Sequence, residues 1–210
     1  MDRDEVWQTI DEQRSSVADL LDDLSPDEWA TPSLCTEWRV RDVAAHLTFA
    51  HAGLFEAAGW MLRARGNFDR MIRDSAIDRA KLPVDQYSGM IRDMVGSRKK
   101  APGISHLEPL IDVLVHGQDI AIPLGRPRPM PAEAAAVAAT RAWTMGRPFH
   151  AQRTFSGLEL VATDHPWSVG QGLRVEGPMA ALLLLVTKRS AALAQLSGPG
   201  LTRIDHLAWQ

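Results

Sequence analysis

The sequence contains a single cysteine, Cys35, among 210 residues. One cysteine excludes an intramolecular disulfide and the cysteine-rich class of structural zinc modules. Long apolar runs are also missing: the longest, PMAALLLLV at 178–186, is far shorter than the roughly 20 residues that a membrane-spanning helix needs. The opening stretch, MDRDEVWQTI, is acidic and amphipathic, unlike a secretory signal. These absences predict a protein of the cytoplasm with no membrane partner.

An excess of positive charge is missing as well. The 23 basic and 26 acidic residues give a net charge of −3 and an isoelectric point near 6.2, which argues against a nucleic-acid partner. Basic residues gather between Arg63 and Lys81, but Asp69, Asp74 and Asp78 are interleaved with them, as is typical of a solvated helix face. With 45% hydrophobic residues, the chain can bury a core without a metal, so any metal it binds is expected to serve function.

The spacing of apolar residues predicts a mainly α fold that is α+β overall. Capping residues and helix breakers define the expected helices at 4–24, 39–65, 106–122, 131–145 and 178–196. A short helix is expected just after Ser25, and another lies within 68–81 or within 84–98. Alternating residues predict strands at 155–164 and 172–177, and a further short strand is expected at 201–204. We therefore expect a helical bundle over residues 1–150, with a small α/β lobe over residues 151–210 packed on it.

Two polar residues interrupt the apolar helix expected at 106–122. Asp112 and His116, in LIDVLVHGQD, are four residues apart and project from the same side of a helix. A carboxylate and an imidazole at this spacing can ligate one divalent ion, and they suit zinc, with nickel, iron or manganese as alternatives. A buried pair of this kind can also be a hydrogen-bonded couple of the core.

A third ligand is expected from the helix at 39–65, because helical bundles build metal sites from facing side chains. His46 lies at the edge of the apolar stripe of this helix and His51 lies nearer its middle, so periodicity does not choose between them. Three protein ligands would leave one coordination position for water or substrate, which is typical of catalytic zinc.

The segment TPSLCTEWRVRDVAAHL, at 31–47, resembles the signature of the mycothiol-dependent maleylpyruvate isomerase family, part of the DinB-like metalloprotein superfamily. The resemblance continues through LIDVLVHGQDIAIPLGRP at 110–127 and through 170–198, and it leaves only about 66–104 unplaced. It implies a DinB-like four-helix bundle that holds a divalent metal, usually zinc. It also assigns the metal ligands: His46, Asp112 and His116, of which Asp112 stands where the isomerase has Glu.

Neighbouring residues could support such a site. Asp119, three residues after His116, either orients that imidazole or lies on the surface, and Asp42, one turn before His46, has the same two interpretations. Cys35 is interpreted as a small buried side chain, because the sequence places no obvious base beside it. The tryptophans are interpreted as packing anchors: Trp29, Trp38, Trp60, Trp143 and Trp167.

The resemblance implies thiol chemistry, with mycothiol, an actinobacterial sugar thiol, as cosubstrate. The expected function is that of a metal-dependent thiol S-transferase or isomerase, in which the metal activates the thiol for addition to a small electrophile. The arginines of 63–79 are candidates to bind the thiol. The alternatives are a metal-binding carrier or sensor without turnover and a metal-dependent hydrolase. The expected partners are the small-molecule thiol and the electrophilic substrate, and a homodimer is the assembly considered.

Overall fold

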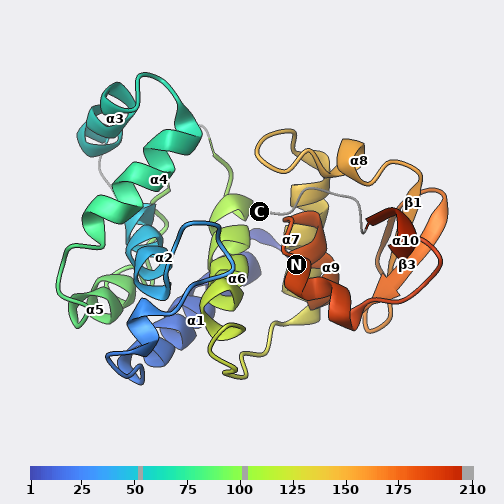
Figure 1. Cartoon of the computed structure of the whole chain (residues 1–210), viewed down its shortest axis with the longest axis horizontal. Coiled ribbons are helices and arrows are strands. Elements are labelled where there is room, and N and C mark those ends of the chain that lie inside the picture. Colours follow the sequence, from blue (N-terminus) through green and yellow to red (C-terminus); the bar gives the residue numbers. More distant parts are fainter. Residues whose placement is uncertain (52–53, 101–103, 205–210) are drawn as a thin grey trace. The chain divides into compact units, whose positions relative to one another are not determined.

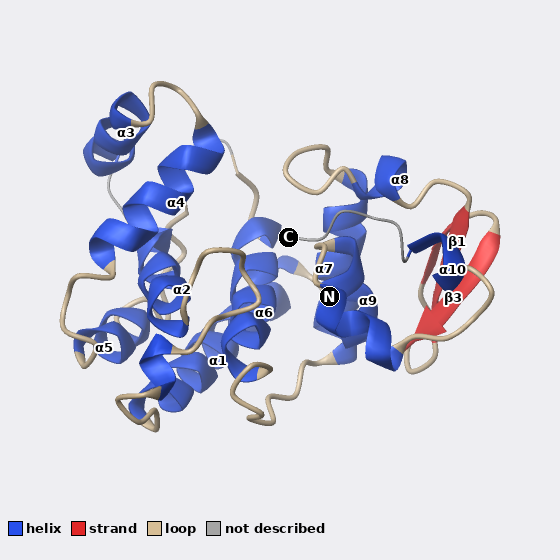
Figure 2. Cartoon of the chain, in the orientation of Figure 1, coloured by secondary structure: helices blue, strands red, loops and turns tan. Residues whose placement is uncertain are grey.

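The computed structural model describes residues 1–51, 54–100 and 104–204, without the side chains of 50–58, 68 and 69. The chain forms two compact units, Asp2–Arg128 and Pro129–Gln210, with Met1 belonging to the second. In Figure 2 the elements drawn in the first unit are helices, whereas the second combines helices with strands. The boundary follows Arg128 rather than residue 150, because the helix at 132–144 packs against the helix at 179–186.

The first unit is a bundle in which α6 contacts both α1 and α2, while α5 packs on α1 and α4 packs on α2 (Figure 1). The elements of this unit are α1 (Arg3–Asp22), η1 (Glu28–Ala30), α2 (Val40–Leu47), η2 (Thr48–His51), α3 (Leu54–Arg63), α4 (Phe68–Arg79), α5 (Gln86–Arg92) and α6 (Leu107–Ala121). Both helices considered for 68–98 are present, one on each side of Pro83. The predicted helical bundle is therefore confirmed, and α2 and α6 form the contact on which the site depends.

The helix expected at 39–65 is not continuous. Its first part, α2, ends at Leu47, where the hydroxyl of Thr48 donates to the carbonyl of Ala45 at 2.7 Å and competes with the helical hydrogen bonds. The second part, α3, ends at Arg63, and the turn after it ends at Gly66, which has a φ of 77° and whose N–H donates to the carbonyl of Met61 at 3.0 Å. The break leaves His46 in the last turn of α2.

The second unit contains a three-stranded sheet in the order β2-β1-β3. The central strand β1 pairs antiparallel with β2 and parallel with β3, and α9 packs on β1. Leu160 of β1 and Val175 of β3 lie opposite each other and are fully buried. The elements are α7 (Ala132–Thr144), α8 (Ala151–Thr154), β1 (Leu158–Ala162), β2 (Ser168–Gly170), β3 (Leu173–Gly177), α9 (Met179–Val186), η3 (Ser190–Gln195) and α10 (Leu201–Ile204).

Two predictions for this unit were wrong. The helix expected to run to Leu196 ends at Val186, where the Thr187 hydroxyl donates to the carbonyl of Leu183 at 2.8 Å and Lys188 takes a left-handed φ of 67°. The strand expected at 201–204 is the short helix α10 instead. Within the ranges that the structure describes, no helix combines the length and the apolar character that crossing a membrane requires.

Candidate metal centre

The three predicted ligands lie together in the first unit. Asp112 Oδ1 is 3.3 Å from His46 Nε2 and 3.4 Å from His116 Nε2. One ligand atom from each residue lies within 4.8 Å of the other two. His46 comes from the last turn of α2, whereas Asp112 and His116 come from successive turns of α6, and these two helices are in contact. The contact between the helices thus joins residues that are 66 positions apart in the sequence.

The donor set fits a divalent metal. Zinc bonds to nitrogen and oxygen of about 2.0–2.1 Å place two ligand atoms of a tetrahedron about 3.3 Å apart, which agrees with the two separations from Asp112 Oδ1. Two imidazoles and one carboxylate are also the combination found in catalytic zinc centres that keep a position open. Each of the three side chains is partly exposed, so a small molecule can reach them.

Asp119 lies behind the site and fixes the orientation of one imidazole. Its Oδ2 is 2.8 Å from His116 Nδ1, and Asp119 is fully buried. A carboxylate accepts hydrogen bonds only, so Nδ1 of this imidazole carries a proton, and Nε2 faces Asp112. The interpretation of Asp119 as an orienting residue therefore agrees with the geometry, and the surface interpretation does not.

Cys35 also reaches this carboxylate, although the sequence placed no base beside it. Its Sγ donates to Asp119 Oδ2 at 3.1 Å and lies 3.7 Å from His116 Nδ1. The loop before α2 carries the thiol there, because the backbone N–H of Leu34 donates to the carbonyl of Asp119 at 3.2 Å. Cys35, His116 and Asp119 form a second group with metal-ligating atoms, and it shares His116 with the first. No local sequence signal marks this contact, which spans 84 residues.

Trp38 packs against both histidines. Its ring centroid is 5.2 Å from that of His46 and 6.3 Å from that of His116, and Trp38 is 8% exposed. The two imidazoles meet edge to face, with their centroids 4.8 Å apart. The prediction that Trp38 anchors packing is confirmed, and its position restricts rotation of the two rings.

Asp42 has neither of the two roles considered for it, because it is buried and bonds to Arg39. Its Oδ2 accepts hydrogen bonds from the backbone N–H of Arg39 at 2.8 Å and from the Arg39 Nε at 2.9 Å. These contacts cap the start of α2, and none joins Asp42 to His46 among the described residues. The side chain of His51, the alternative to His46, lies outside the described residues.

The charges around Asp112 act in opposite directions. Burial raises the pKa of its carboxyl, but the hydrogen bond and charge of His46, together with the charges of His116 and Arg14, lower that pKa below its ordinary value. Asp112 is consequently an anion at neutral pH, which is the form that binds a cation.

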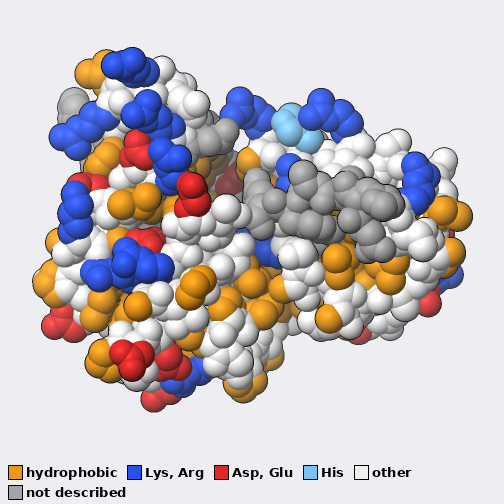
Figure 3. Space-filling model, in the orientation of Figure 1, with side chains coloured by type: hydrophobic (Ala, Val, Ile, Leu, Met, Phe, Trp, Pro, Cys, Tyr) orange, Lys and Arg blue, Asp and Glu red, His pale blue; other side chains and the backbone are white. Residues whose placement is uncertain are grey.

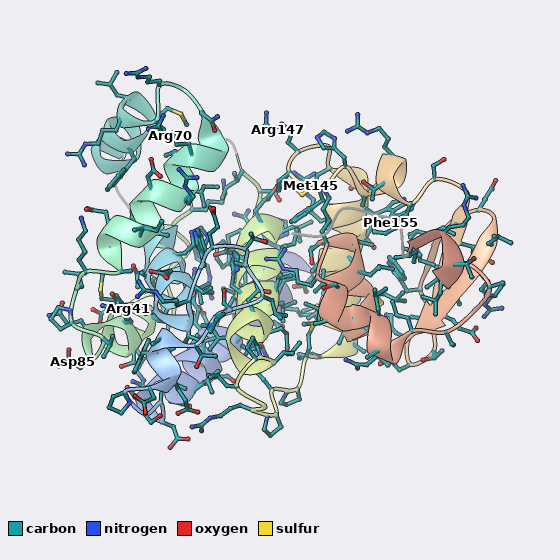
Figure 4. All side chains as sticks on the ribbon, in the orientation of Figure 1. Arg41, Arg70, Asp85, Met145, Arg147 and Phe155 are labelled. Carbon is teal, nitrogen blue, oxygen red and sulfur yellow. The ribbon has the colours of Figure 1, made fainter. Side chains whose placement is uncertain are left out.

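The basic residues considered for thiol binding gather over α3 and α4 (Figure 3). Arg70, labelled in Figure 4, and Arg73 both bond to Asp74, while Arg79 lies over the ring of Phe49 with its guanidinium carbon 4.3 Å from the centroid. The structure brings none of these arginines within contact of the three candidate ligands among the described residues. Their role in thiol binding stays a prediction.

Fold and site together define a class: a helical bundle with a His–Asp–His cluster between two of its helices, joined to a small α/β unit. Residues 10–87 match the family model of the mycothiol maleylpyruvate isomerase N-terminal domain. The fold is similar to two crystal structures of the mycothiol-dependent maleylpyruvate isomerase, one of them a mutant. In each case the TM-score is 0.66 and the identity 13%, over 93% of this chain and 92% of the other. No curated protein matches the sequence.

These comparisons confirm the resemblance over residues 10–87 and show that the predicted fold is similar to that of the isomerase. The matched family segment contains His46 and Cys35 but ends before Asp112 and His116. The similarity of fold extends over α6 and over the second unit. At 13% identity it shows a shared architecture and does not assign roles to individual residues. The assignment of Asp112 and His116 as ligands therefore depends on the geometry of the site.

Proposed function

We propose that this protein is a metal-dependent thiol S-transferase or isomerase, with mycothiol as the thiol and a small electrophile as the second substrate. The proposed ligands of a divalent metal, zinc by preference, are His46, Asp112 and His116. One observation carries the proposal: both Nε2 atoms face a single Asp112 oxygen at the separations of a tetrahedral site. We place the reaction in the cytoplasm, where thiols stay reduced.

A bound divalent metal supplies a Lewis acid that lowers the pKa of a thiol, so that the thiolate forms at neutral pH. Residues around the proposed ligands would support this chemistry by fixing the two imidazoles. Asp119 holds the proton of His116 on Nδ1, and Trp38 packs on both imidazole rings. Three protein donors leave room for one external ligand.

Two reaction outcomes follow from addition of the thiol to an electrophilic carbon. If the carbon belongs to a conjugated double bond, the adduct allows rotation about the former double bond, and loss of the thiol then gives the isomer. If the thiol remains attached, the product is a thioether and the reaction is an S-transfer. The family match and the fold of the isomerase favour thiol addition over other uses of a metal centre.

Metal content provides the first test. Elemental analysis of protein purified without chelator should find about one divalent metal per chain, and His116→Ala should lose it, because a three-ligand site rarely survives on two. His106→Ala is the matched control, since His106 precedes α6 and is outside the cluster. A wild-type protein that is free of metal and takes up none on addition would mean that the cluster is a hydrogen-bonded core couple.

Turnover provides the second test. The metal-loaded protein is incubated with mycothiol and an electrophile carrying a cis double bond, with and without chelator, and products are followed by mass and by absorbance. Thiol-dependent, chelator-sensitive formation of the isomer or thioether supports the proposal. Metal binding with no rate above the uncatalysed one would identify a carrier or sensor, and turnover without thiol would identify a hydrolase.

A further inference from the structure

A buried arginine lies close to the candidate metal centre. Arg14 on α1 is 4% exposed, and its Nη1 donates to the carbonyls of Met94 at 2.8 Å and Ser97 at 3.4 Å. Among the described residues, the carboxylate nearest to it is that of Asp11, at 3.7 Å, and Asp11 is itself paired with Arg98 at 2.7 Å. The guanidinium is thus fixed in place and almost wholly buried, with Asp11 as its nearest carboxylate among the described residues.

Arg14 and Asp112 line the same small cavity. Its volume is about 20 Å³, and the rest of its wall is apolar, including Val17 and Val113. A cavity of this size holds about one water molecule. It is too small for a substrate, and the carboxylate in its wall would repel a second carboxylate.

The two polar side chains of this cavity have complementary unused groups. The contacts of Asp112 with other described residues all involve Oδ1, so its Oδ2 has no hydrogen bond with them. Arg14 uses only Nη1, which leaves the N–H groups on Nε and Nη2 without a partner in the described part of the chain. The residues that carry this acceptor and these donors therefore both line a space that fits one water, and water is a molecule that can bond to both.

We propose that Arg14 is a positioning residue for Asp112. A water in the cavity accepts a hydrogen bond from Arg14 and donates one to Asp112 Oδ2, which keeps Oδ1 directed at His46 and His116. The carbonyls of Met94 and Ser97 hold the guanidinium still, so the orientation of Asp112 is fixed before any metal arrives. The consequence for metal affinity rests on the proposed function, but the coupling of Arg14 to Asp112 does not.

The first experiment measures the affinity of chelator-stripped protein for Zn²⁺ by competition with a chromogenic chelator. Arg14→Met should weaken binding about tenfold to a hundredfold, as the loss of an outer partner of a ligand does. Arg14→Lys should recover part of that loss, because an ammonium still donates into the cavity. The visible spectrum of the Co²⁺ form should change in Arg14→Met, reporting altered carboxylate geometry. Arg98→Met is the control, since Arg98 also contacts Asp11 but does not line the cavity.

A second pair of variants leaves the arginine in place. Val113→Ile adds a methylene to a side chain that lines the cavity, so it should exclude the water and weaken Zn²⁺ binding as Arg14→Met does. Val115→Ile makes the same change two residues further along α6, at a buried side chain outside the cavity, and should leave the affinity within about twofold. These variants keep the proposal testable if Arg14→Met does not fold.

The third experiment separates this proposal from the proposed function. Arg14→Met, Asp112→Asn and the double variant are unfolded with urea in the presence of chelator. Coupling between the two residues should change the unfolding equilibrium constant by more than about twofold relative to additivity. A wild type that binds no metal would end the proposed function, yet a coupled cycle would still support the Arg14–Asp112 contact. An additive cycle would overturn the proposed coupling of Arg14 to Asp112. The coupling would also be overturned if Arg14→Met kept its Zn²⁺ affinity and only raised the KM for acidic electrophiles.

Discussion

Asp119→Asn tests whether the carboxylate bonded to His116 affects metal binding at the candidate centre. Asp119 Oδ2 accepts hydrogen bonds from His116 Nδ1 at 2.8 Å and from Cys35 Sγ at 3.1 Å, in a fully buried position. Asparagine keeps the shape of the side chain but removes its charge. Its amide group also adds two donors where two donors already converge, so the imidazole loses a charged acceptor and some of its orientation.

The magnitude follows from the kind of hydrogen bond that is lost. A hydrogen bond to a charged group contributes about 1.5–3 kcal/mol, against about 0.5–1.5 kcal/mol for a neutral pair. The difference of about 1–1.5 kcal/mol corresponds to about a tenfold loss of metal affinity. This lies at the lower end of the roughly 10–100-fold effect of mutating the partner of a ligating histidine. The metal-free variant should also unfold about 1–3 kcal/mol more easily, because buried donors lose their acceptor.

Asp42→Asn is the matched control for this measurement. Asp42 is 2% exposed and bonds to Arg39 at the start of α2, so its carboxylate is as buried as that of Asp119 without touching the cluster. The control should lose about 1 kcal/mol of stability through its cap and keep its Zn²⁺ affinity. The reasoning is refuted if Asp119→Asn binds Zn²⁺ as tightly as the wild type in the chelator competition, or if both variants lose affinity equally.

Three further outcomes are expected. Cys35→Ala should lower the free energy of unfolding by about 1 kcal/mol in urea and Cys35→Ser by less, because the hydroxyl still donates to the buried carboxylate; equal losses would contradict this. In the presence of chelator, the contribution of Asp112 to the free energy of unfolding should be complete above its ordinary pKa of 3.8. It should disappear as the pH falls through the lower pKa that Asp112 has in the folded protein. Asp112→Asn should therefore flatten this part of the acid unfolding curve. Trp38→Leu should destabilise the fold by about 2 kcal/mol and weaken Zn²⁺ binding, since both imidazoles lose their packing partner; unchanged affinity would show that the tryptophan serves stability alone.

The sequence predicted the part of the site that depends on one helix. Asp112 and His116 are one turn apart, so any helix over these residues places them together. The choice between His46 and His51 needed the family resemblance. The apolar periodicity was applied to one continuous helix at 39–65, whereas the helix that contains His46 ends at Leu47. The hydroxyl of Thr48 that ends it forms a local contact that apolar spacing does not report.

The contacts behind the ligands could not be predicted from residue patterns. Cys35 meets Asp119 only because a loop hydrogen bond attaches Leu34 to the end of α6, and Arg14 reaches the cavity only because α1 packs beside α6. Such contacts are set by how helices pack and not by spacing within one helix. The same limit explains why the boundary between the units was not predicted. The sequence of α7 does not differ from that of a bundle helix, and only its packing on α9 assigns it to the second unit.

The charge of the donor set points to the kind of external ligand that the centre prefers. In the proposed centre, two neutral imidazoles and the Asp112 carboxylate would offset one of the two positive charges of a divalent ion, so an anionic fourth ligand would complete neutrality. A thiolate supplies that charge, and a neutral thiol or alcohol does not. Asp119, bonded to His116, and Arg14, which lines a cavity with Asp112, carry opposite charges and lie outside the set of three proposed ligands. A neutral residue at 112 would remove this charge and one of the three proposed ligands, so Asp112→Asn should weaken Zn²⁺ binding in the chelator competition, as His116→Ala should.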